Sequence, residues 1–385
     1  MRVQNLIARH RWVLLGAGAV IQLAVGIPSA FGAFFAPLQK EYRLEETPLT
    51  LVFACIIGFF GLGCVAGGAL RDRRGPRCAG LWGAALLGAG FCFLLFAPAG
   101  SALALIAGFS APVGLGCAFL TPAVLTAAQR WYPDRQGLAT GVVGLGMGLS
   151  GAALSLLSRW LLPALGVRWG FAALGGLLAL LTAAGSAFLC DPPGKAQRAK
   201  PESLWSVAHS RAFWLLFSAT ALAAPSVLLF SPVIAELAGE RGLGEGAALA
   251  LVALGSAGSA AGRLAAPALS DRLGRRRVDK ALFAALCALS AGFGFAGGWL
   301  LFLLWPALTF CYAGQAALLP TMAVDLFGPA GAGRNFGLLA LGQSAGSVGF
   351  TLLAAALGGA PVRHLVAVGA AAAGFAALWM LGKRG

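Results

Sequence analysis

Apolar stretches of similar length, separated by short polar segments, follow one another along almost the whole chain. A helix needs about 20 apolar residues to cross the hydrocarbon core of a bilayer. Because open strand edges cannot be satisfied in lipid, we interpret these stretches as helices. The pattern therefore predicts an all-α integral membrane protein with twelve transmembrane helices. The predicted spans are 11–37, 50–70, 78–98, 101–129, 136–161, 168–190, 211–236, 247–269, 280–298, 299–324, 335–358 and 362–382.

The longest polar segment, 191–210, divides the chain into two halves with six predicted spans each. A repeat supports this division, because Asp72–Gly75 precedes the third span and Asp271–Gly274, 199 positions later, precedes the ninth. Two such parallel halves place a binding site at their interface near the middle of the membrane. We predict two pseudo-symmetric six-helix bundles, residues 1–190 and 211–385, joined by a cytoplasmic loop.

The composition agrees with a membrane protein, because 59% of the 385 residues are hydrophobic and only 11% are charged. The net charge of +15 could suggest nucleic-acid binding, but the positions of the charges argue against it. With a cytoplasmic N-terminus, 21 of the 28 Lys and Arg residues fall in cytoplasmic segments, as the positive-inside rule requires. We therefore expect both termini in the cytoplasm, no nucleic-acid partner, and a monomeric multi-pass protein in the lipid bilayer of the inner (plasma) membrane.

Arg263 is the charged side chain that lies deepest in a predicted span. It precedes Asp271, at the end of that span, by eight residues, which is about 12 Å along a helix. An arginine at this depth costs at least ~2.5–3.5 kcal/mol to insert, so it usually faces a watery cavity and meets an anion. The Asp and Glu residues fall at the ends of the apolar stretches or in loops, so we expect no buried carboxylate.

Two loops at equivalent places of the repeat share an acidic residue, a glycine and several basic residues. They are Gly68–Arg77, after the second span, and Ser270–Arg276, after the eighth. Both resemble the G-x-x-x-D-R/K-x-G-R/K-R/K loop of the major facilitator superfamily. The resemblance implies the fold of that superfamily, with twelve helices in two bundles that give alternating access to a central site.

The acidic residues of these loops are predicted to close the cytoplasmic side of the cavity. A carboxylate at a helix end can meet the positive N-terminal end of a neighbouring helix. We expect Asp72 to dock at the start of the eleventh span and Asp271 at the start of the fifth. The predicted gating residues are Asp72, Arg73, Asp271, Arg272, Arg135 and Arg334.

A narrower resemblance begins at Arg130–Gly141, which reads RWYPDRQGLATG. This segment is similar to the RWFPDRRGLATG-type stretch of the oxalate/formate antiporter family, which is related to the monocarboxylate transporters. Ser210–Trp214 and Arg334–Gly337 support the same resemblance. In that family an arginine on the eighth span binds a substrate carboxylate, and Arg263 occupies the matching position. A guanidinium suits this role because it is permanently charged and can bind a carboxylate through two hydrogen bonds.

The oxalate transporters also carry a lysine on the eleventh span, where this sequence has Gln343. One cation and one neutral amide suit a monoanion better than a dianion. Of the rings that surround the substrate in that family, Tyr312 is retained and Thr121 replaces another, which implies a roomier cavity. Polar residues on the expected cavity faces complete the set, although each alone is more often a contact between helices. The predicted substrate-binding residues are Arg263, Gln343, Tyr312, Thr121, Gln315, Ser259 and Ser29.

We therefore predict a secondary active transporter of a small organic anion, a monocarboxylate of the lactate, pyruvate or formate type, that uses Arg263 to bind the carboxylate. Two alternatives stay open, namely an oxalate/formate-type anion antiporter and a non-transporting membrane sensor with the same fold. Ser259 stands where proton-coupled monocarboxylate transporters typically have an aspartate, which favours anion exchange. An enzyme would need a nucleophile with its base, or clustered acids and histidines, near the bilayer. We find no such pattern, and we expect no catalytic residue, cofactor or metal site.

Overall fold

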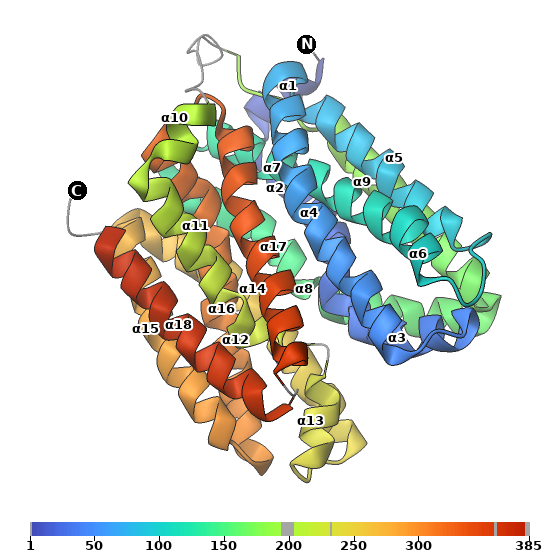
Figure 1. Ribbon diagram of the computed structural model, residues 1–385. Helices are drawn as coiled ribbons and strands as arrows, with labels where there is room; N and C mark the ends of the chain where they lie inside the picture. The colour runs from blue at the N-terminus through green and yellow to red at the C-terminus, as the bar shows by residue number, and fades with distance from the viewer. Residues whose placement is uncertain (1, 194–203, 232, 358–359, 382–385) are drawn as a thin grey trace.

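The computed structural model describes residues 2–193, 204–231, 233–357 and 360–381. This part of the chain is helical, with eleven helices that are long and apolar enough to span a membrane. The prediction of an all-α membrane protein is therefore confirmed. Figure 1 shows two helical bundles side by side, one from each half of the chain. Half of the connecting segment 191–210 lies outside the described residues, and its helix α10 covers Leu204–His209.

The first bundle is built from the N-terminal half of the chain. Its helices are α1 (Arg2–Arg9), α2 (Arg11–Val25), α3 (Ile27–Tyr42), α4 (Glu46–Arg74), α5 (Pro76–Phe93), α6 (Ala102–Leu105), η1 (Ile106–Ser110), α7 (Ala111–Trp131), η2 (Pro133–Arg135), α8 (Gln136–Leu165) and α9 (Val167–Ala187).

The second bundle follows α10 and repeats the arrangement. Its helices are α11 (Arg211–Ala223), α12 (Pro225–Leu228), α13 (Ile234–Glu240), α14 (Glu245–Leu273), α15 (Arg275–Phe295), η4 (Gly298–Leu300), α16 (Leu301–Phe327), α17 (Ala332–Ala356) and α18 (Ala360–Leu381).

Four predicted spans differ from the observed helices, and one of them, 101–129, is divided into α6, the π-helical turn η1 and α7. The span 78–98 corresponds to α5, which has 18 residues, begins with Pro76 and Arg77, and is not among the eleven apolar helices of the described chain. It still packs within the first bundle, against α7 and α9. The span 11–37 is divided at Gly26 into α2 and α3, and the span 211–236 is divided into α11, α12 and α13. A proline lies just inside α3 and α12, where its missing N–H is tolerated because the first helical N–H groups have no partner.

The two bundles meet along two close helix crossings, α4 with α17 and α8 with α14. A Cβ at Gly68 of α4 would lie 2.1 Å from the carbonyl oxygen of Gly333. A Cβ at Gly137 of α8 would likewise lie 2.1 Å from the carbonyl oxygen of Pro267. Because no side chain fits at either position, glycine permits the approach of the backbones, as is common between membrane helices.

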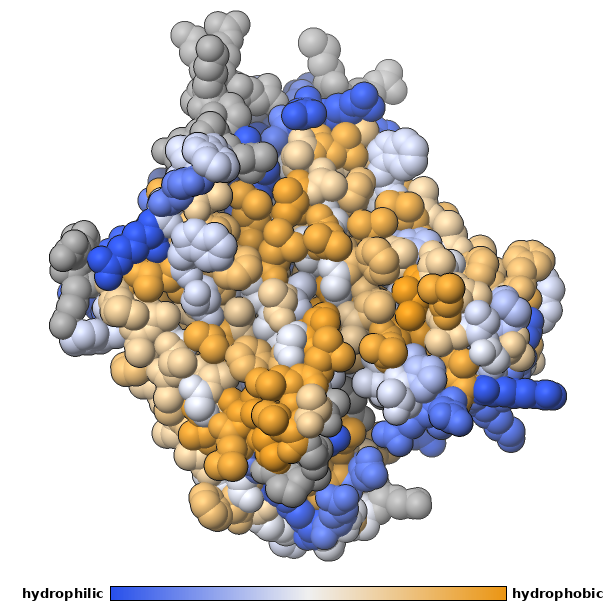
Figure 2. All heavy atoms as spheres, viewed as in Figure 1, coloured by the Kyte–Doolittle hydropathy of each residue, from blue (hydrophilic) through white to orange (hydrophobic). Residues whose placement is uncertain are grey.

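We call the end of the molecule that carries these crossings the terminal side. Arg11 at the start of α2 lies there, because its guanidinium donates to the carbonyl oxygen of Trp131 at 3.4 Å. The other end, where α3, α9 and α14 have Tyr42, Val167 and Glu245, is the opposite side. Figure 2 shows apolar residues across the middle of the molecule and hydrophilic residues gathered toward its ends, as expected of a protein surrounded by lipid.

Candidate functional site

A cavity of about 420 Å³ lies between the two bundles and is lined by residues of both. Its lining reaches Arg159 and Leu249 near the opposite side, and both side chains are exposed. On the terminal side the two glycine crossings bring the bundles into contact. The cavity is therefore accessible from the opposite side and closed at the terminal side.

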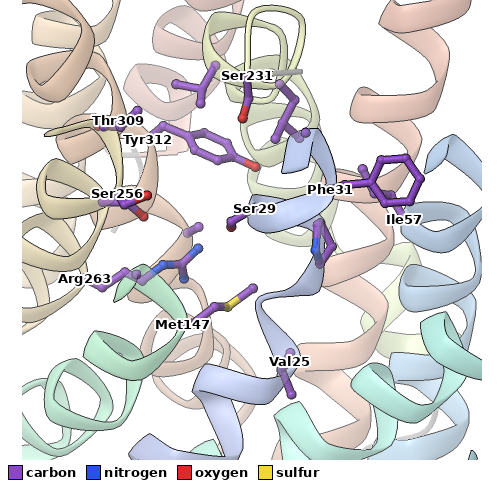
Figure 3. A pocket seen from close by; sticks show the side chains of 18 of the residues that line it. Val25, Ser29, Phe31, Ile57, Met147, Ser231, Ser256, Arg263, Thr309 and Tyr312 are labelled. Atoms are coloured by element: carbon purple, nitrogen blue, oxygen red, sulfur yellow. The ribbon is translucent and has the colours of Figure 1, made fainter. Parts of the chain in front are cut away.

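Arg263 lines this cavity from α14, about 15 Å along the helix from its terminal end at Leu273. Space for the side chain is left by Gly144 of α8, whose Cβ position is 3.4 Å from the Cβ of Arg263. Figure 3 shows the guanidinium pointing into the cavity. Its Nε atom is buried and has no hydrogen-bond partner, and no ion pair of Arg263 occurs among the described residues. The group is thus positioned to bind an anion.

Tyr312 and Gln343 line the same cavity from α16 and α17. The side-chain amide of Gln343 donates a hydrogen bond of 2.5 Å to the hydroxyl oxygen of Tyr312. Figure 3 shows the Tyr312 hydroxyl pointing into the same space as the Arg263 guanidinium. Because the hydroxyl oxygen accepts this bond, its own hydrogen stays available to donate to a ligand.

Three further predicted residues, Ser29, Thr121 and Ser259, also line the cavity. Ser29 lies three residues after Gly26, where α2 and α3 are divided, and Figure 3 shows it near the Arg263 guanidinium. Thr121 is buried, and its hydroxyl donates to the carbonyl oxygen of Cys117 in its own helix at 2.9 Å. This bond occupies the hydroxyl hydrogen and leaves the oxygen able to accept.

Gln315 does not line the cavity, although it was predicted with Tyr312. Its side chain is 2% exposed within the bundle. Thr309, one turn before Tyr312, lines the cavity instead, as does Ser344 beside Gln343. Thr309 and Gln315 are each three residues from Tyr312, so helical spacing alone does not decide which of them faces the cavity.

The two acidic loop residues lie at the helix N-termini that the sequence indicated. A carboxylate oxygen of Asp72 accepts a hydrogen bond of 3.0 Å from the backbone N–H of Arg334, near the start of α17. The carboxylate of Asp271 accepts hydrogen bonds of 3.0 Å from the backbone N–H groups of Gly137 and Leu138, at the start of α8. Each carboxylate thus meets the positive end of a helix dipole of the other bundle.

The basic residues of the predicted gate take a smaller part. Arg73, Arg135 and Arg272 are exposed, whereas Arg334 is half-buried and its guanidinium donates to Asn335 at 3.5 Å. Arg275 contributes more than the sequence indicated. Its guanidinium forms an ion pair with Asp325 and lies 3.9 Å from a carboxylate oxygen of Asp271. The same guanidinium donates a hydrogen bond of 3.4 Å to the side chain of Gln136, which belongs to the other bundle.

A charged cluster that sequence reasoning assigned only to topology lies behind Asp72. The buried guanidinium of Arg71 donates to Asp191 at 2.6 Å and to Asp72 at 3.3 Å. Arg130 donates to the other oxygen of Asp191 at 2.9 Å. Burial and the adjacent Asp191 raise the pKa of the Cys190 thiol, so this thiol stays neutral. The cluster joins α4, α7 and the segment after α9, and no local pattern in the sequence shows that these segments meet.

The expectation that no carboxylate would be buried was wrong. Asp279 is 0% exposed, and neither of its carboxylate oxygens has a hydrogen-bond partner. The predicted span started at residue 280, but α15 begins at Arg275 and carries Asp279 into the bundle. Asp279 does not line the cavity, and the described lining includes Arg159 and Arg263 but no Asp or Glu.

Candidate metal ligands do not gather in the described chain, where no three His, Cys, Asp or Glu residues lie close enough to hold an ion.

Two helical bundles around a cavity that is accessible from one side define a membrane transporter. The model of the Major Facilitator Superfamily matches residues 14–351. The chain belongs to this superfamily and is a multi-pass membrane transporter of small molecules, not an enzyme.

Several relatives match the chain at modest sequence identity. An uncharacterized 38 kDa protein of Thermoproteus tenax is 32% identical, with 81% of this chain and 80% of the relative covered. The oxalate:formate antiporter of Oxalobacter formigenes is 27% identical, with 88% and 83% covered. Human monocarboxylate transporter 11 is 28% identical over 68% of this chain, which spans only 56% of that relative.

The same fold occurs in the crystal structure of the superfamily transporter FucP in the outward conformation. It matches with a TM-score of 0.72 at 14% identity, over 97% of this chain and 99% of FucP. At this identity the likeness concerns the fold alone.

Proposed function

We propose that this protein transports a small organic monoanion with a carboxylate group, and that Arg263 binds the carboxylate. The observation that carries the proposal is a guanidinium inside the cavity with no anionic partner among the described residues. A charge at this depth is costly unless it meets a counter-charge. The relatives named for monocarboxylates and for oxalate and formate support an anionic substrate.

The distribution of cations in the cavity favours one anionic group on the substrate. Besides Arg263, the only cation in the described lining is Arg159. Arg159 follows Gly144, the residue opposite Arg263, by fifteen residues on α8, which is about 22 Å. A short dianion such as oxalate cannot reach both. Gln343, which stands where the oxalate transporters have a second cation, is a neutral amide. It can form hydrogen bonds but cannot neutralise a charge.

Alternating access would follow from breaking the contacts at the terminal side. With the termini in the cytoplasm of a cell whose inner membrane holds the protein, the cavity faces outward in this conformation. The carboxylates of Asp72 and Asp271 then act as the cytoplasmic gate, because each bridges from one bundle to a helix N-terminus of the other. Rocking the bundles about the central site would break these bonds and open the cytoplasmic side.

Anion exchange is the form of transport that the site favours. In the described lining no carboxylate is present that could carry a proton. An empty site would leave the charge of Arg263 without an anion during the crossing, which opposes return without substrate. The oxalate:formate antiporter is a relative in which exchange is named. An oxalate/formate-type exchanger is therefore the second candidate.

Counterflow in proteoliposomes tests this proposal. Vesicles preloaded or not with unlabelled anion receive labelled formate, oxalate, lactate or pyruvate, for the wild type and for Arg263→Ala. We expect uptake of a monocarboxylate that requires both Arg263 and preloading. Uptake that follows a pH gradient without preloading would contradict exchange. Absence of Arg263-dependent uptake for every anion, with binding retained, would favour a non-transporting sensor.

A further inference from the structure

We propose that the substrate is an amphiphilic monocarboxylate, with an unbranched apolar chain of about four to eight carbons or an aromatic ring, rather than formate or oxalate. This inference rests on the proposed role of Arg263 and adds the chemistry of the rest of the substrate. The observation that carries it is that Arg263 stands in a cavity whose lining is mostly apolar.

The wall formed by the second bundle carries Arg263 and several polar side chains, among apolar ones. Arg263 and Ser256 on α14, Thr309 and Tyr312 on α16, and Gln343 on α17 all line it. Figure 3 shows the first four of these side chains on one side of the cavity. A carboxylate bound by the guanidinium and the Tyr312 hydroxyl would be anchored at this wall, so the remainder of the substrate must extend toward the first bundle.

The facing wall, formed by the first bundle, is mostly apolar, although Gln22, Ser29 and Thr121 also belong to it. Phe31 and Ile57 lie across the space from Arg263 and Ser256 in Figure 3, whereas Met147 lies beside the Arg263 guanidinium and Val25 lies below both. Phe31 packs on Phe53 with 4.9 Å between ring centroids, and both rings belong to the lining. Apolar surface of this kind gains free energy only when an apolar group displaces the water against it.

The size of the cavity agrees with a substrate that has an apolar body. Its volume of about 420 Å³ lies in the range of roughly 300–1,000 Å³ that protein pockets use for drug-sized ligands. Formate and oxalate have three and six heavy atoms, so most of the cavity would stay filled with water. Neither anion has an apolar group that could contact Met147 or the rings.

Thermal stabilisation of the purified protein by a series of acids tests the inference without transport, because longer acids cross bilayers unaided. Apparent dissociation constants are measured at neutral pH for formate, oxalate, acetate, butanoate, hexanoate and phenylacetate. We expect binding to tighten by about two- to fourfold per added methylene, so that hexanoate binds at least about tenfold more tightly than acetate. Formate or oxalate binding as tightly as hexanoate would overturn the inference.

Variants test whether the apolar chain of the substrate contacts the first bundle. Phe53→Ala should reduce the advantage of hexanoate over acetate several-fold and leave acetate binding within about twofold. Leu62→Ala, on the same helix but 61% exposed on the outside, is the matched control and should change neither. An unchanged hexanoate advantage in Phe53→Ala would contradict the placement of the chain. If no acid stabilises the protein in an Arg263-dependent manner, the proposed function fails and this inference falls with it.

Discussion

Gln343 and Tyr312 form a hydrogen bond of 2.5 Å inside the cavity, with the amide as donor and the phenolic oxygen as acceptor. The two residues come from α17 and α16, so the bond fixes one helix of the cavity wall against the next. It also orients the Tyr312 ring, which is 6% exposed, so that the hydroxyl hydrogen is directed away from Gln343. A neutral amide thereby positions a donor for the anion that we propose Arg263 binds.

Removal of this donor should weaken binding of the anion. In Tyr312→Phe the ring stays and the hydroxyl is lost, and a hydrogen bond to a charged group is worth about 1.5–3 kcal/mol. We expect the apparent dissociation constant of the substrate to rise roughly 10- to 100-fold. Tyr132→Phe, at the end of α7 and outside the cavity lining, is the matched control. Equal affinities for the two variants would show that the Tyr312 hydroxyl does not contact the substrate.

The carboxylate of Asp271 should protect the start of α8 from hydrogen exchange. Asp271→Asn removes the charge and at least one of the bonds from Gly137 and Leu138, a loss of about 1.4 kcal/mol. We expect amide exchange in the segment 136–141 to become roughly tenfold faster. Glu236→Gln, exposed near the opposite side, should leave this segment unchanged. Unaltered exchange in Asp271→Asn would remove the basis for a gate at this crossing.

Glycine at position 137 should be required for closure of the terminal side. In Gly137→Ala the new Cβ would lie 2.1 Å from the Pro267 carbonyl oxygen, so α8 and α14 must move apart. Such overpacking costs about 1–3 kcal/mol, and we expect slower transport with a terminal side that is open more often. Gly16→Ala on α2 meets no atom within 4 Å and should be neutral or slightly stabilising. Transport rates and accessibility labelling of the cavity from the terminal side compare the two.

The buried charges behind Asp72 should matter more for stability than the ion pair near the opposite side. Asp191→Ala leaves Arg71, which is 1% exposed, with Asp72 alone and should cost about 3–5 kcal/mol. Glu41→Ala breaks the pair with Arg168, whose two side chains are about one third exposed, and should cost at most about 1 kcal/mol. The apparent Tm of each variant in detergent measures the difference. Similar Tm losses would mean that Arg71 is solvated or paired in another way.

The sequence predicts the fold well because membrane helices leave a strong and local signal. Length and hydropathy place the helices, and the repeat relates Asp72 to Asp271 before any contact is known. The same signal cannot find divisions within a span, so the breaks at Gly26 and Pro225 emerge only from the structure.

Side-chain directions and contacts between distant segments are harder to predict from the sequence. Helical spacing suggested that Gln315 faces the cavity with Tyr312, but the structure buries it elsewhere. Asp279 was assigned to a loop because the basic residues before it ended the apolar stretch, yet these residues are helical and Asp279 is buried. The bond between Arg71 and Asp191 joins residues 120 positions apart, which no local pattern records.

Equilibrium binding of a labelled monocarboxylate to purified protein tests the role of Arg263 most directly. The measurement compares the wild type with Arg263→Gln, Arg263→Lys and the control Arg276→Gln, an exposed arginine near the start of α15. Loss of a desolvated charge partner costs about 2–5 kcal/mol, so Arg263→Gln should weaken binding at least about thirtyfold. Arg263→Lys should bind with intermediate affinity because it keeps the charge but not the two-pronged geometry. Wild-type affinity in Arg263→Gln would contradict the account.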